Sequence, residues 1–297
     1  MAEALLRVSH LTKAFALSRH EALRAVSDVS FSLAPGEIFG LVGESGSGKS
    51  TLARTISGLY RPTSGQVFLE ELEISQPKVY ARCRSRIAHT LQFLFQDSMA
   101  SLNPRLPIGA LIEEPLVIHR EGTRQSRRET ALGLMAQVGL DAALYSQYPA
   151  ELSGGMRQRV CIARALALSP KLIIADEPIA SLDVSMQAQI VNLFQSLCQA
   201  RGVSLLFIAH DLSMVRHISR RIGVMCRGRL VELAPAPSLY EHPQHPYTQA
   251  LLSAVYAPDP ALAKAQQRLP FDADSFFQAQ APLQWREIAP EHFVLLP

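Results

Sequence analysis

Short apolar segments and amphipathic segments alternate along most of this chain. Three of the apolar segments, Leu172–Ala175, Ser204–Ala209 and Ile222–Cys226, are separated by stretches in which apolar positions have helical spacing. A strand that is apolar on both faces is typical of a parallel sheet that helices cover on both sides. The pattern therefore predicts a core of the α/β class.

Strand-like segments also precede this core, and a helix follows one of them. These strands are predicted at Leu5–Val8, Val29–Leu33, Ile38–Val42 and Gln66–Leu69. The residues Lys49–Gly58 have the pattern of a helix that ends at a glycine. The chain is therefore expected to run from a buried strand through a glycine-rich loop into a helix.

The character of the sequence changes between residues 99 and 152. Pro104, Pro107 and Pro115 are expected to interrupt regular structure in the first part of this region. The second part, Arg127–Val138, carries apolar residues at helical spacing, namely Ala131, Leu134, Met135 and Val138. We therefore expect a helical insertion within the α/β core.

The composition is that of a globular protein with little net charge. The chain has 297 residues, of which 48% are hydrophobic, and 29 basic and 26 acidic residues give a net charge of +3. Such a small charge does not predict nucleic-acid binding, and the arginine groups at 82–86 and 124–128 are typical of solvated surfaces. We expect no nucleic-acid partner.

Neither a signal peptide nor a membrane-spanning helix is predicted. Met1–Val8 contains Glu3 and lacks a long apolar stretch, and no apolar run approaches the roughly 18 residues of a membrane helix. The cysteines are far apart and lack the spacing of metal ligands: Cys83, Cys161, Cys198 and Cys226. We therefore expect a soluble chain with reduced, mostly buried cysteines.

The loop between the strand Ile38–Val42 and the following helix has the pattern of a phosphate-binding loop. Its residues are Gly43, Glu44, Ser45, Gly46, Ser47, Gly48, Lys49 and Ser50. Glycine lets the backbone curl around an anion and direct its N–H groups inward. At the helix N-terminus Lys49 can reach the β and γ phosphates, and the hydroxyl of Ser50 can ligate Mg²⁺, with Thr51 as a second hydroxyl. The alternative is a glycine-rich turn without a ligand.

Acidic and imidazole side chains follow two of the apolar segments. Asp176 and Glu177 follow the first, and ligands of open α/β sheets bind at the carboxyl ends of the strands. Asp176 suits a contact with Mg²⁺, and Glu177 can accept a proton from an attacking water. His210 follows the second segment and can hydrogen-bond a γ phosphate or that water. An acidic helix cap and a structural histidine are the alternatives.

A second candidate anion site lies at Leu152–Arg159, whose sequence is LSGGMRQR. Ser153 can cap a helix that runs to Leu168, which leaves the amides of Gly154 and Gly155 exposed at the positive end of the helix. One nucleotide does not need two such helix ends from the same chain. We therefore expect this site to serve a nucleotide held by another subunit, a hypothesis that spacing alone does not decide.

Together these sequences resemble the ATPase subunit of ATP-binding cassette (ABC) transporters. The resemblance covers about residues 5–255 and includes the phosphate loop, Gln96, the LSGG sequence, Leu172–Glu177, Ser181–Asp183 and His210. Two further sequences, Ser101–Arg105 and His245–Leu252, resemble the branch that imports dipeptides, oligopeptides and nickel.

The resemblance implies a domain organisation. The fold would be a P-loop NTPase (RecA-like) core with an ABC-specific antiparallel β region and an inserted helical subdomain. An ABC ATPase domain would span residues 1–255, with its catalytic core at about 1–98 and 153–240 and its helical subdomain at about 99–152. Residues 256–297 would form a C-terminal extension. The aromatic side chains of Phe276, Phe277 and Trp285 would allow this extension to dock.

The resemblance also implies roles for single residues. Two ATPase domains would pair head to tail, with each ATP between the phosphate loop of one domain and the LSGG sequence of the other. Phe15 would stack on adenine, or pack in the core, and Asp183 would lie at the dimer seam. Gln96 would contact Mg²⁺ or water and relay the nucleotide state to a groove in the helical insertion. Glu177 would be the general base, and Lys49, Mg²⁺, His210 and Ser153 of the partner subunit would stabilise the developing charge.

The sequence departs from the family pattern at a few positions without losing a catalytic group. Less usual residues stand at Ser98, Ile179, Ser181 and Ala209. No cysteine follows Cys226, so we expect no iron–sulfur cluster of the kind that some relatives carry. His242 and His245 are not expected to bind zinc, because prolines interrupt the segment and no acidic or thiol partner accompanies them.

The expected function is ATP hydrolysis that energises solute import at the cytoplasmic face of the inner membrane. The implied partners are a second ATPase subunit, a paralogue rather than an identical copy, two transmembrane permeases and an extracytoplasmic solute-binding protein. Peptides are the first candidate cargo, and nickel or a metal chelate is the alternative. An ABC ATPase that acts on nucleic acid or ribosomes usually has long coiled coils or two cassettes, and the sequence has neither. A regulator without turnover disagrees with the complete set of acid, base and phosphate-binding residues.

Overall fold

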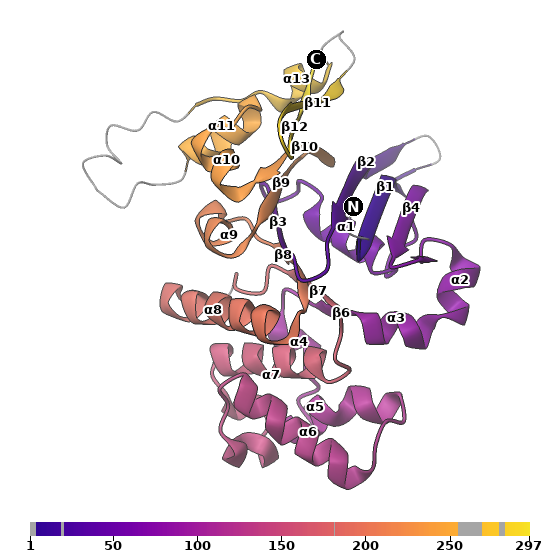
Figure 1. The fold of residues 1–297 in the computed structure, drawn as a ribbon, viewed down its shortest axis with the longest axis vertical. Helices are drawn as coiled ribbons and strands as arrows, with labels where there is room; N and C mark the ends of the chain where they lie inside the picture. Colours follow the sequence, from indigo (N-terminus) through magenta and orange to yellow (C-terminus); the bar gives the residue numbers. More distant parts are fainter. Residues whose placement is uncertain (1–3, 19–20, 181, 255–268, 279–282) are drawn as a thin grey trace.

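The protein consists of two β-sheets with helices packed beside them (Figure 1). The computed structural model describes residues 4–18, 21–180, 182–254, 269–278 and 283–297. The first sheet is antiparallel and consists, in order, of β2 (Ala22–Leu33), β1 (Leu6–Ala16), β4 (Ser64–Leu69) and β5 (Leu72–Glu73). Both β1 and β2 are longer than the sequence pattern predicted, because they continue as a two-stranded ribbon beyond their apolar parts.

The second sheet contains the parallel strands that the sequence predicted. Its order is β11 (Gln284–Ala289), β12 (His292–Leu296), β10 (Arg229–Pro235), β9 (Arg221–Cys226), β3 (Ile38–Val42), β8 (Ser204–Ile208), β7 (Leu172–Asp176) and β6 (Leu91–Leu94). The five strands from β9 to β6 are parallel, and β10, β12 and β11 are added antiparallel. The predicted α/β class with a separate antiparallel region is confirmed.

Helices cover both faces of the parallel strands. The helices are α1 (Lys49–Ile56), α2 (Pro77–Arg82), α3 (Arg84–Thr90), α4 (Ser98–Ser101), α5 (Ile108–Ile118), α6 (Arg124–Gln137), α7 (Gly154–Leu166), α8 (Val184–Arg201), α9 (Leu212–Ile218), α10 (Ala236–Glu241), α11 (Pro246–Ser253) and α13 (Ala273–Gln278). Two short 3₁₀ helices are η1 (Ala142–Ser146) and η2 (Pro149–Glu151). Within the described segments, no helix has both the length and the apolar character needed to cross a bilayer.

Alternate residues of the parallel strands enter two different hydrophobic clusters. In β8, Leu205 and Phe207 belong to the cluster shared with the helical insertion, whereas Leu206 and Ile208 belong to the cluster shared with α1 and the antiparallel sheet. All four side chains are fully buried. This two-sided burial is the physical reason for the continuous apolar run, because each face of the strand packs against another layer.

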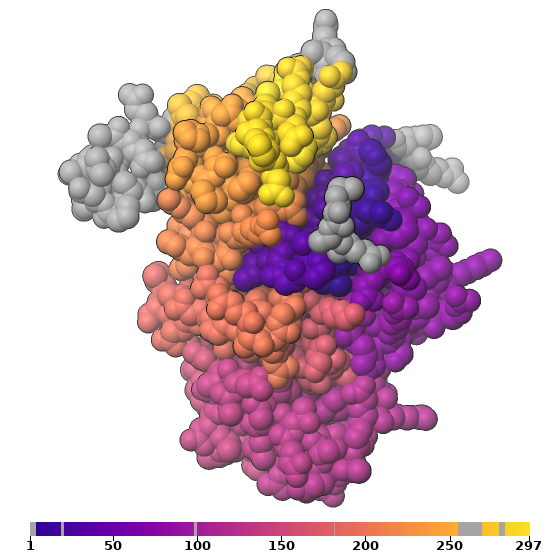
Figure 2. Space-filling view, in the orientation of Figure 1, coloured from indigo at the N-terminus to yellow at the C-terminus, as the bar shows by residue number. Residues whose placement is uncertain are grey.

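The insertion between β6 and α7 is helical and lies at one end of the molecule, opposite the C-terminal hairpin (Figure 2). Its helix α6 begins at Arg124, three positions earlier than the pattern indicated, because Thr123 and Ser126 form a capping box. The expectation that Pro115 interrupts regular structure was wrong, since Pro115 lies inside α5. An interior proline costs about 3 kcal/mol. Burial of Ile108, Leu111 and Ile112 of α5 contributes roughly 1.5–3 kcal/mol for each side chain, which offsets that cost.

The C-terminal segment joins the main sheet, which its sequence did not predict. Strand β12 pairs with β10, and the β11–β12 hairpin forms the edge of the sheet. Phe277 is half-buried and packs against the core, as expected for a docking residue. Trp285 instead lies on the exposed strand β11 and is 39% exposed, so its predicted docking role is wrong. Residues 256–268 of the predicted extension lie outside the described part of the chain.

The cysteines are placed as expected for thiols of a folded core. Cys161, Cys198 and Cys226 are buried, and Cys83 is partly exposed. Burial raises the pKa of both Cys198 and Cys226 to about 12. These thiols therefore stay protonated at neutral pH.

Candidate active site

The predicted phosphate loop connects β3 with α1. Gly48 has a φ of 102° and directly precedes Lys49, the first residue of α1. A Cβ atom on Gly48 would lie 2.2 Å from the carbonyl oxygen of Ala25, and one on Gly43 would lie 2.2 Å from that of Met225. Both positions therefore require glycine. The resulting turn places the loop at the positive end of the α1 dipole, where phosphate binding is favourable.

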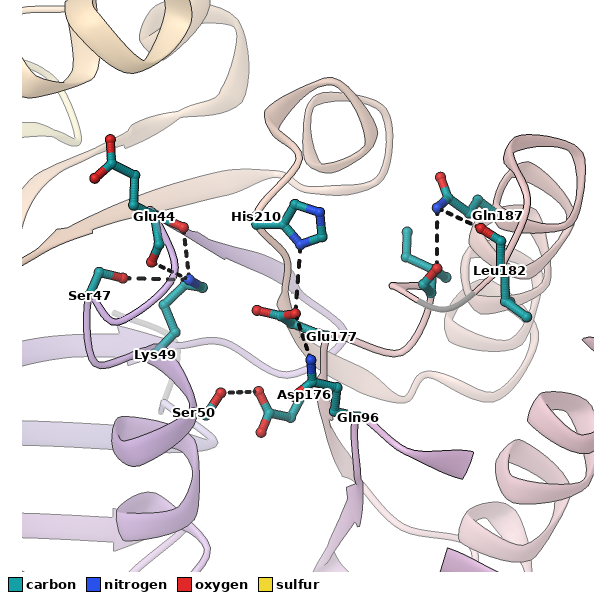
Figure 3. Close-up of polar contacts among 12 residues, drawn as sticks. Glu44, Ser47, Lys49, Ser50, Gln96, Asp176, Glu177, Leu182, Gln187 and His210 are labelled. Carbon is teal, nitrogen blue, oxygen red and sulfur yellow. Dashed lines mark hydrogen bonds and ion pairs between the residues drawn. The ribbon is translucent and has the colours of Figure 1, made fainter. Parts of the chain in front are cut away.

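Lys49 is held inside this loop by two backbone carbonyls (Figure 3). Its Nζ donates hydrogen bonds to the oxygens of Gly43 at 2.7 Å and Glu44 at 2.9 Å. The residue is 3% exposed, and burial lowers its pKa, while the nearby carboxylates of Glu177, Asp176 and Glu44 act in the opposite direction. The loop thus holds the Lys49 ammonium close to its own backbone, the position that a phosphate-binding lysine requires.

Asp176 ends β7 and meets the first turn of α1. Ser50 Oγ donates a 2.8 Å hydrogen bond to Asp176 Oδ1. The other oxygen, Oδ2, is buried without a hydrogen-bond partner, and Arg54 Nη2 lies 3.8 Å from it. Burial raises the pKa of Asp176, whereas the Ser50 hydrogen bond and the Arg54 charge act to lower it. An unsatisfied carboxylate oxygen beside a hydroxyl is a donor set that fits Mg²⁺.

Glu177 brings together side chains from three strand ends. Its carboxylate Oε2 accepts a 3.1 Å hydrogen bond from Gln96 Nε2, and His210 Nδ1 lies 3.6 Å from the same oxygen (Figure 3). The backbone of Glu177 has a φ of 48° and donates its N–H to the carbonyl of Ile208. A non-glycine residue in this left-handed conformation costs about 1–3 kcal/mol, and such strain is concentrated at functional sites.

Sheet topology explains why these residues meet. The phosphate loop follows β3 and His210 follows β8. Asp176 ends β7, Glu177 comes directly after it, and Gln96 follows β6; these strands are neighbours in this order. Because parallel strands have their carboxyl ends at the same edge, the side chains converge there. Sequence reasoning therefore located this group correctly in space, although their chemical roles remain predictions.

Gln96 also lies at the rim of a large groove. The groove has a volume of about 1210 Å³ and runs between α3, β6 and the helical insertion. Its lining includes the exposed apolar side chains of Phe95 and Ile118, as well as Pro115. The same glutamine thus contacts Glu177 and borders this partly apolar surface.

The LSGG sequence forms the start of α7, as predicted. The hydroxyl of Ser153 accepts a hydrogen bond from the N–H of Met156 and caps the helix. Gly154 is exposed, but Gly155 is buried, so its expected exposure was wrong. A Cβ on Gly155 would overlap the Met186 side chain at 1.9 Å, because the start of α8 packs on this turn. Asp183 caps α8 by accepting the N–H of Met186 at 2.9 Å.

The LSGG turn and the phosphate loop do not form one site. Among the residues that the structure describes, no hydrogen bond or ion pair connects Ser153, Gly154, Gly155 or Asp183 with residues 43–50. The two predicted anion sites therefore share no polar contact within the described part of the chain. Of the unusual family positions, Ile179 and Ala209 are buried, whereas Ser181 and the side chain of Ser98 lie outside the described part.

Phe15 lies at the end of β1 and is partly exposed. Its ring contacts that of Tyr60 edge-on at a centroid distance of 5.5 Å, and Lys13 Nζ lies 4.8 Å from the Phe15 ring. Arg54 Nη1 donates a 3.4 Å hydrogen bond to the Tyr60 hydroxyl. Sequence reasoning missed Tyr60 and Arg54, although their position in and after the helix of the phosphate loop was a usable signal.

The sequence also gave no signal for a contact between the phosphate loop and α11. The hydroxyl of Tyr247 accepts a 3.0 Å hydrogen bond from the backbone N–H of Glu44, and 203 positions separate the two residues. Such a pairing has no local pattern that could predict it.

Comparisons with known proteins agree with this geometry. The ABC transporter family matches residues 26–180, and the oligopeptide/dipeptide transporter C-terminal region matches residues 231–276. The oligopeptide transport ATP-binding protein OppF of Bacillus subtilis (strain 168) is 47% identical over 99% of this chain and 97% of its own length. The protein of the same name from Streptococcus mutans is 45% identical over 98% of this chain and 94% of its own length.

Solved structures show the same fold. A dimeric post-hydrolysis state of the ATP-binding cassette MJ0796 bound to ADP and Pi superposes with a TM-score of 0.70 at 28% identity, covering 78% of this chain and 98% of that chain. The structure of cbiO1 from Clostridium perfringens, part of the transporter complex cbiONQ, has a TM-score of 0.71 at 22% identity, covering 81% and 92% of the two chains.

Proposed function

This chain belongs to the ABC transporter family of ATP-binding proteins, and from that membership we propose that it hydrolyses ATP to energise the import of peptides. The main structural support for ATP hydrolysis is that four side chains converge at one edge of the sheet: Lys49, Ser50, Asp176 and Glu177. The peptide cargo is supported by the C-terminal region match and by relatives named as oligopeptide transport ATP-binding proteins.

The phosphate loop binds the triphosphate of ATP. Backbone N–H groups at the start of α1 face the phosphates, and Lys49 places its ammonium against the β and γ positions. When bound, Mg²⁺ would be held by Ser50 and Asp176, with Gln96 nearby, and would offset the negative charge of the phosphates. Phe15, supported by Tyr60 at 5.5 Å, offers a ring surface for adenine.

Glu177 acts as the general base of the hydrolysis step. Its Oε2 accepts a hydrogen bond from Gln96, which orients the carboxylate toward the edge of the sheet where the phosphates bind. In that position it accepts the proton of the attacking water. His210, 3.6 Å from the same oxygen, is placed to hydrogen-bond the water or the γ phosphate and to stabilise charge that develops there.

A second ATPase subunit completes the site. The LSGG turn exposes Gly154 at the N-terminus of α7, and among the described residues no hydrogen bond joins this turn to the phosphate loop of its own chain. In a head-to-tail pair this turn covers the nucleotide of the partner, and Asp183 lies at the seam. We propose a paralogue for this role, with each of two composite sites made of the phosphate loop of one chain and the LSGG turn of the other.

The permeases of the importer dock in the groove beside Gln96. The groove is large enough for a short helix, and its exposed apolar side chains, Phe95 and Ile118, offer the contacts that a protein partner buries. The subunit thereby works at the cytoplasmic face of the membrane, next to two permeases fed by an extracytoplasmic binding protein. It uses ATP and Mg²⁺, and we expect no iron–sulfur cluster because the cysteines, Cys83, Cys161, Cys198 and Cys226, lack the spacing of metal ligands.

Reconstitution of the whole importer in liposomes tests this function. We expect a binding protein loaded with an oligopeptide to stimulate ATP turnover and to support peptide uptake. Lys49→Met should abolish stimulation, whereas Lys171→Met, which removes an exposed lysine bound to Glu70, should not. Stimulation of ATP turnover by a nickel chelate instead of a peptide would overturn the assignment of peptides as the cargo. Unchanged stimulation in Lys49→Met would overturn the role of the phosphate loop in ATP hydrolysis.

A further inference from the structure

The C-terminal segment of the chain reaches the phosphate loop through one tyrosine. Tyr247 is the second residue of α11 and is 4% exposed. Its hydroxyl accepts the N–H of Glu44 at 3.0 Å. Its ring packs on Phe271, with ring centroids 5.4 Å apart. The contact therefore joins a buried side chain from a late part of the sequence to the backbone of the nucleotide site.

The hydrogen bond fixes the orientation of one peptide group. The N–H of Glu44 and the carbonyl of Gly43 belong to the same planar peptide unit. The N–H is bound by Tyr247, and the carbonyl oxygen accepts from Lys49 Nζ at 2.7 Å. A peptide group next to glycine rotates with little steric hindrance, since glycine has no Cβ. The tyrosine hydroxyl therefore opposes a rotation that would turn this carbonyl away from Lys49.

Tyr247 is itself fixed by a buried polar cluster. His245 caps α11, because its Nδ1 accepts the N–H of Tyr247 at 3.0 Å. The N–H groups of His245 and Gln244 donate to the fully buried carboxylate of Glu232 on β10. His292 of β12 contacts the same carboxylate at 2.7 Å. Although His245 Nε2 is buried without a hydrogen-bond partner, the bonds to Glu232 and to the N–H of Tyr247 hold the start of α11 in one position.

We propose that Tyr247 is a positioning residue for ATP binding. Its hydroxyl holds the Gly43–Glu44 peptide group, and through this group it sets the position of Lys49. The C-terminal segment is thereby part of the nucleotide site, although it contributes no side chain to the phosphates. This inference rests on the proposed function, because it concerns the same loop and the same nucleotide.

The test compares two tyrosine-to-phenylalanine variants in the assembled importer. Tyr247→Phe keeps the ring contacts and removes the hydroxyl. Tyr240→Phe is the matched control. The Tyr240 hydroxyl, on α10, donates a hydrogen bond to the carbonyl of Leu212 on α9 and makes no hydrogen bond to the phosphate loop. We expect Tyr247→Phe to raise the KM for ATP about tenfold, the effect of one lost hydrogen bond, with kcat changed less than about twofold.

The outcomes separate this proposal from a structural role and from the proposed function. KM does not depend on the fraction of correctly folded complex, so a lower yield of Tyr247→Phe does not affect the comparison. An unchanged KM, an equal rise in Tyr240→Phe, or a loss of kcat alone would overturn the positioning role. None of these results concerns ATP hydrolysis by the wild-type complex. The proposed function is therefore tested separately, by the reconstitution experiment.

Discussion

The two predicted anion sites of this chain differ in how many of their contacts the chain itself supplies. Around the phosphate loop, Lys49 is held by carbonyls of the loop itself, Asp176 accepts from Ser50 of α1, and Glu177 accepts from Gln96 after β6. At the LSGG turn, Ser153 bonds within its own helix, and Gly154 is exposed. We therefore expect hydrolysis to take place at the first site and a ligand held by another subunit to bind at the second. Changes in the two sites should therefore separate hydrolysis from association.

The largest effect is expected at the first site. Glu177→Gln removes the general base but keeps a side chain of the same size, so ATP turnover of the assembled importer should fall roughly 10³-fold. Equilibrium binding of ATP should persist, since the phosphate loop is unchanged. Glu129→Gln, on the exposed surface of α6, is the control and should turn over normally. Turnover above a tenth of the wild-type rate in Glu177→Gln would contradict the assigned role.

A smaller effect is expected at the second site, through the partner. Gly154→Asp places a carboxylate at the N-terminus of α7, which favours the helix but repels a triphosphate. Turnover should fall on the order of 100-fold, while thermal stability and ATP binding by the phosphate loop stay unchanged. Gly154→Ala adds a Cβ with ordinary contacts, 3.5 Å from Leu182, and controls for size. Normal turnover in the aspartate variant would show that this turn does not meet a nucleotide.

The last prediction concerns the free energy of unfolding rather than turnover, and it depends on pH. Burial lowers the pKa of His245 to about 4, so the folded protein keeps it neutral while the unfolded chain takes up a proton below pH 6.5. Stability should therefore fall by about 3 kcal/mol as pH drops from 6.5 to 4. His245→Asn retains a capping acceptor for α11 and should flatten this dependence. Chemical denaturation at several pH values measures it, and an equal slope in both proteins would refute the assignment to His245.

The parts of this site that sequence reasoning predicted are local or follow from one topological rule. The phosphate loop is a continuous sequence, and its strand and helix are its immediate neighbours. Asp176, Glu177 and His210 follow apolar strands, and parallel strands bring such ends together. Once the strands were identified, the convergence of these side chains needed no further information.

The parts that were missed depend on packing between distant segments. Pro115 was expected to interrupt regular structure because proline has a low helix propensity, but burial of the α5 face outweighs that preference. The pairing of β12 with β10 and the contact of Tyr247 with Glu44 join residues far apart in sequence. Neither has a periodic pattern, because each depends on where separate elements dock.

The left-handed backbone of Glu177 has a consequence for how this sequence can change. Glycine would adopt that conformation without strain, whereas glutamate carries a conformational cost. Replacing Glu177 by glycine would therefore relieve local strain but remove the carboxylate that we propose as the general base. Selection for stability and selection for turnover are thus expected to act in opposite directions at this position.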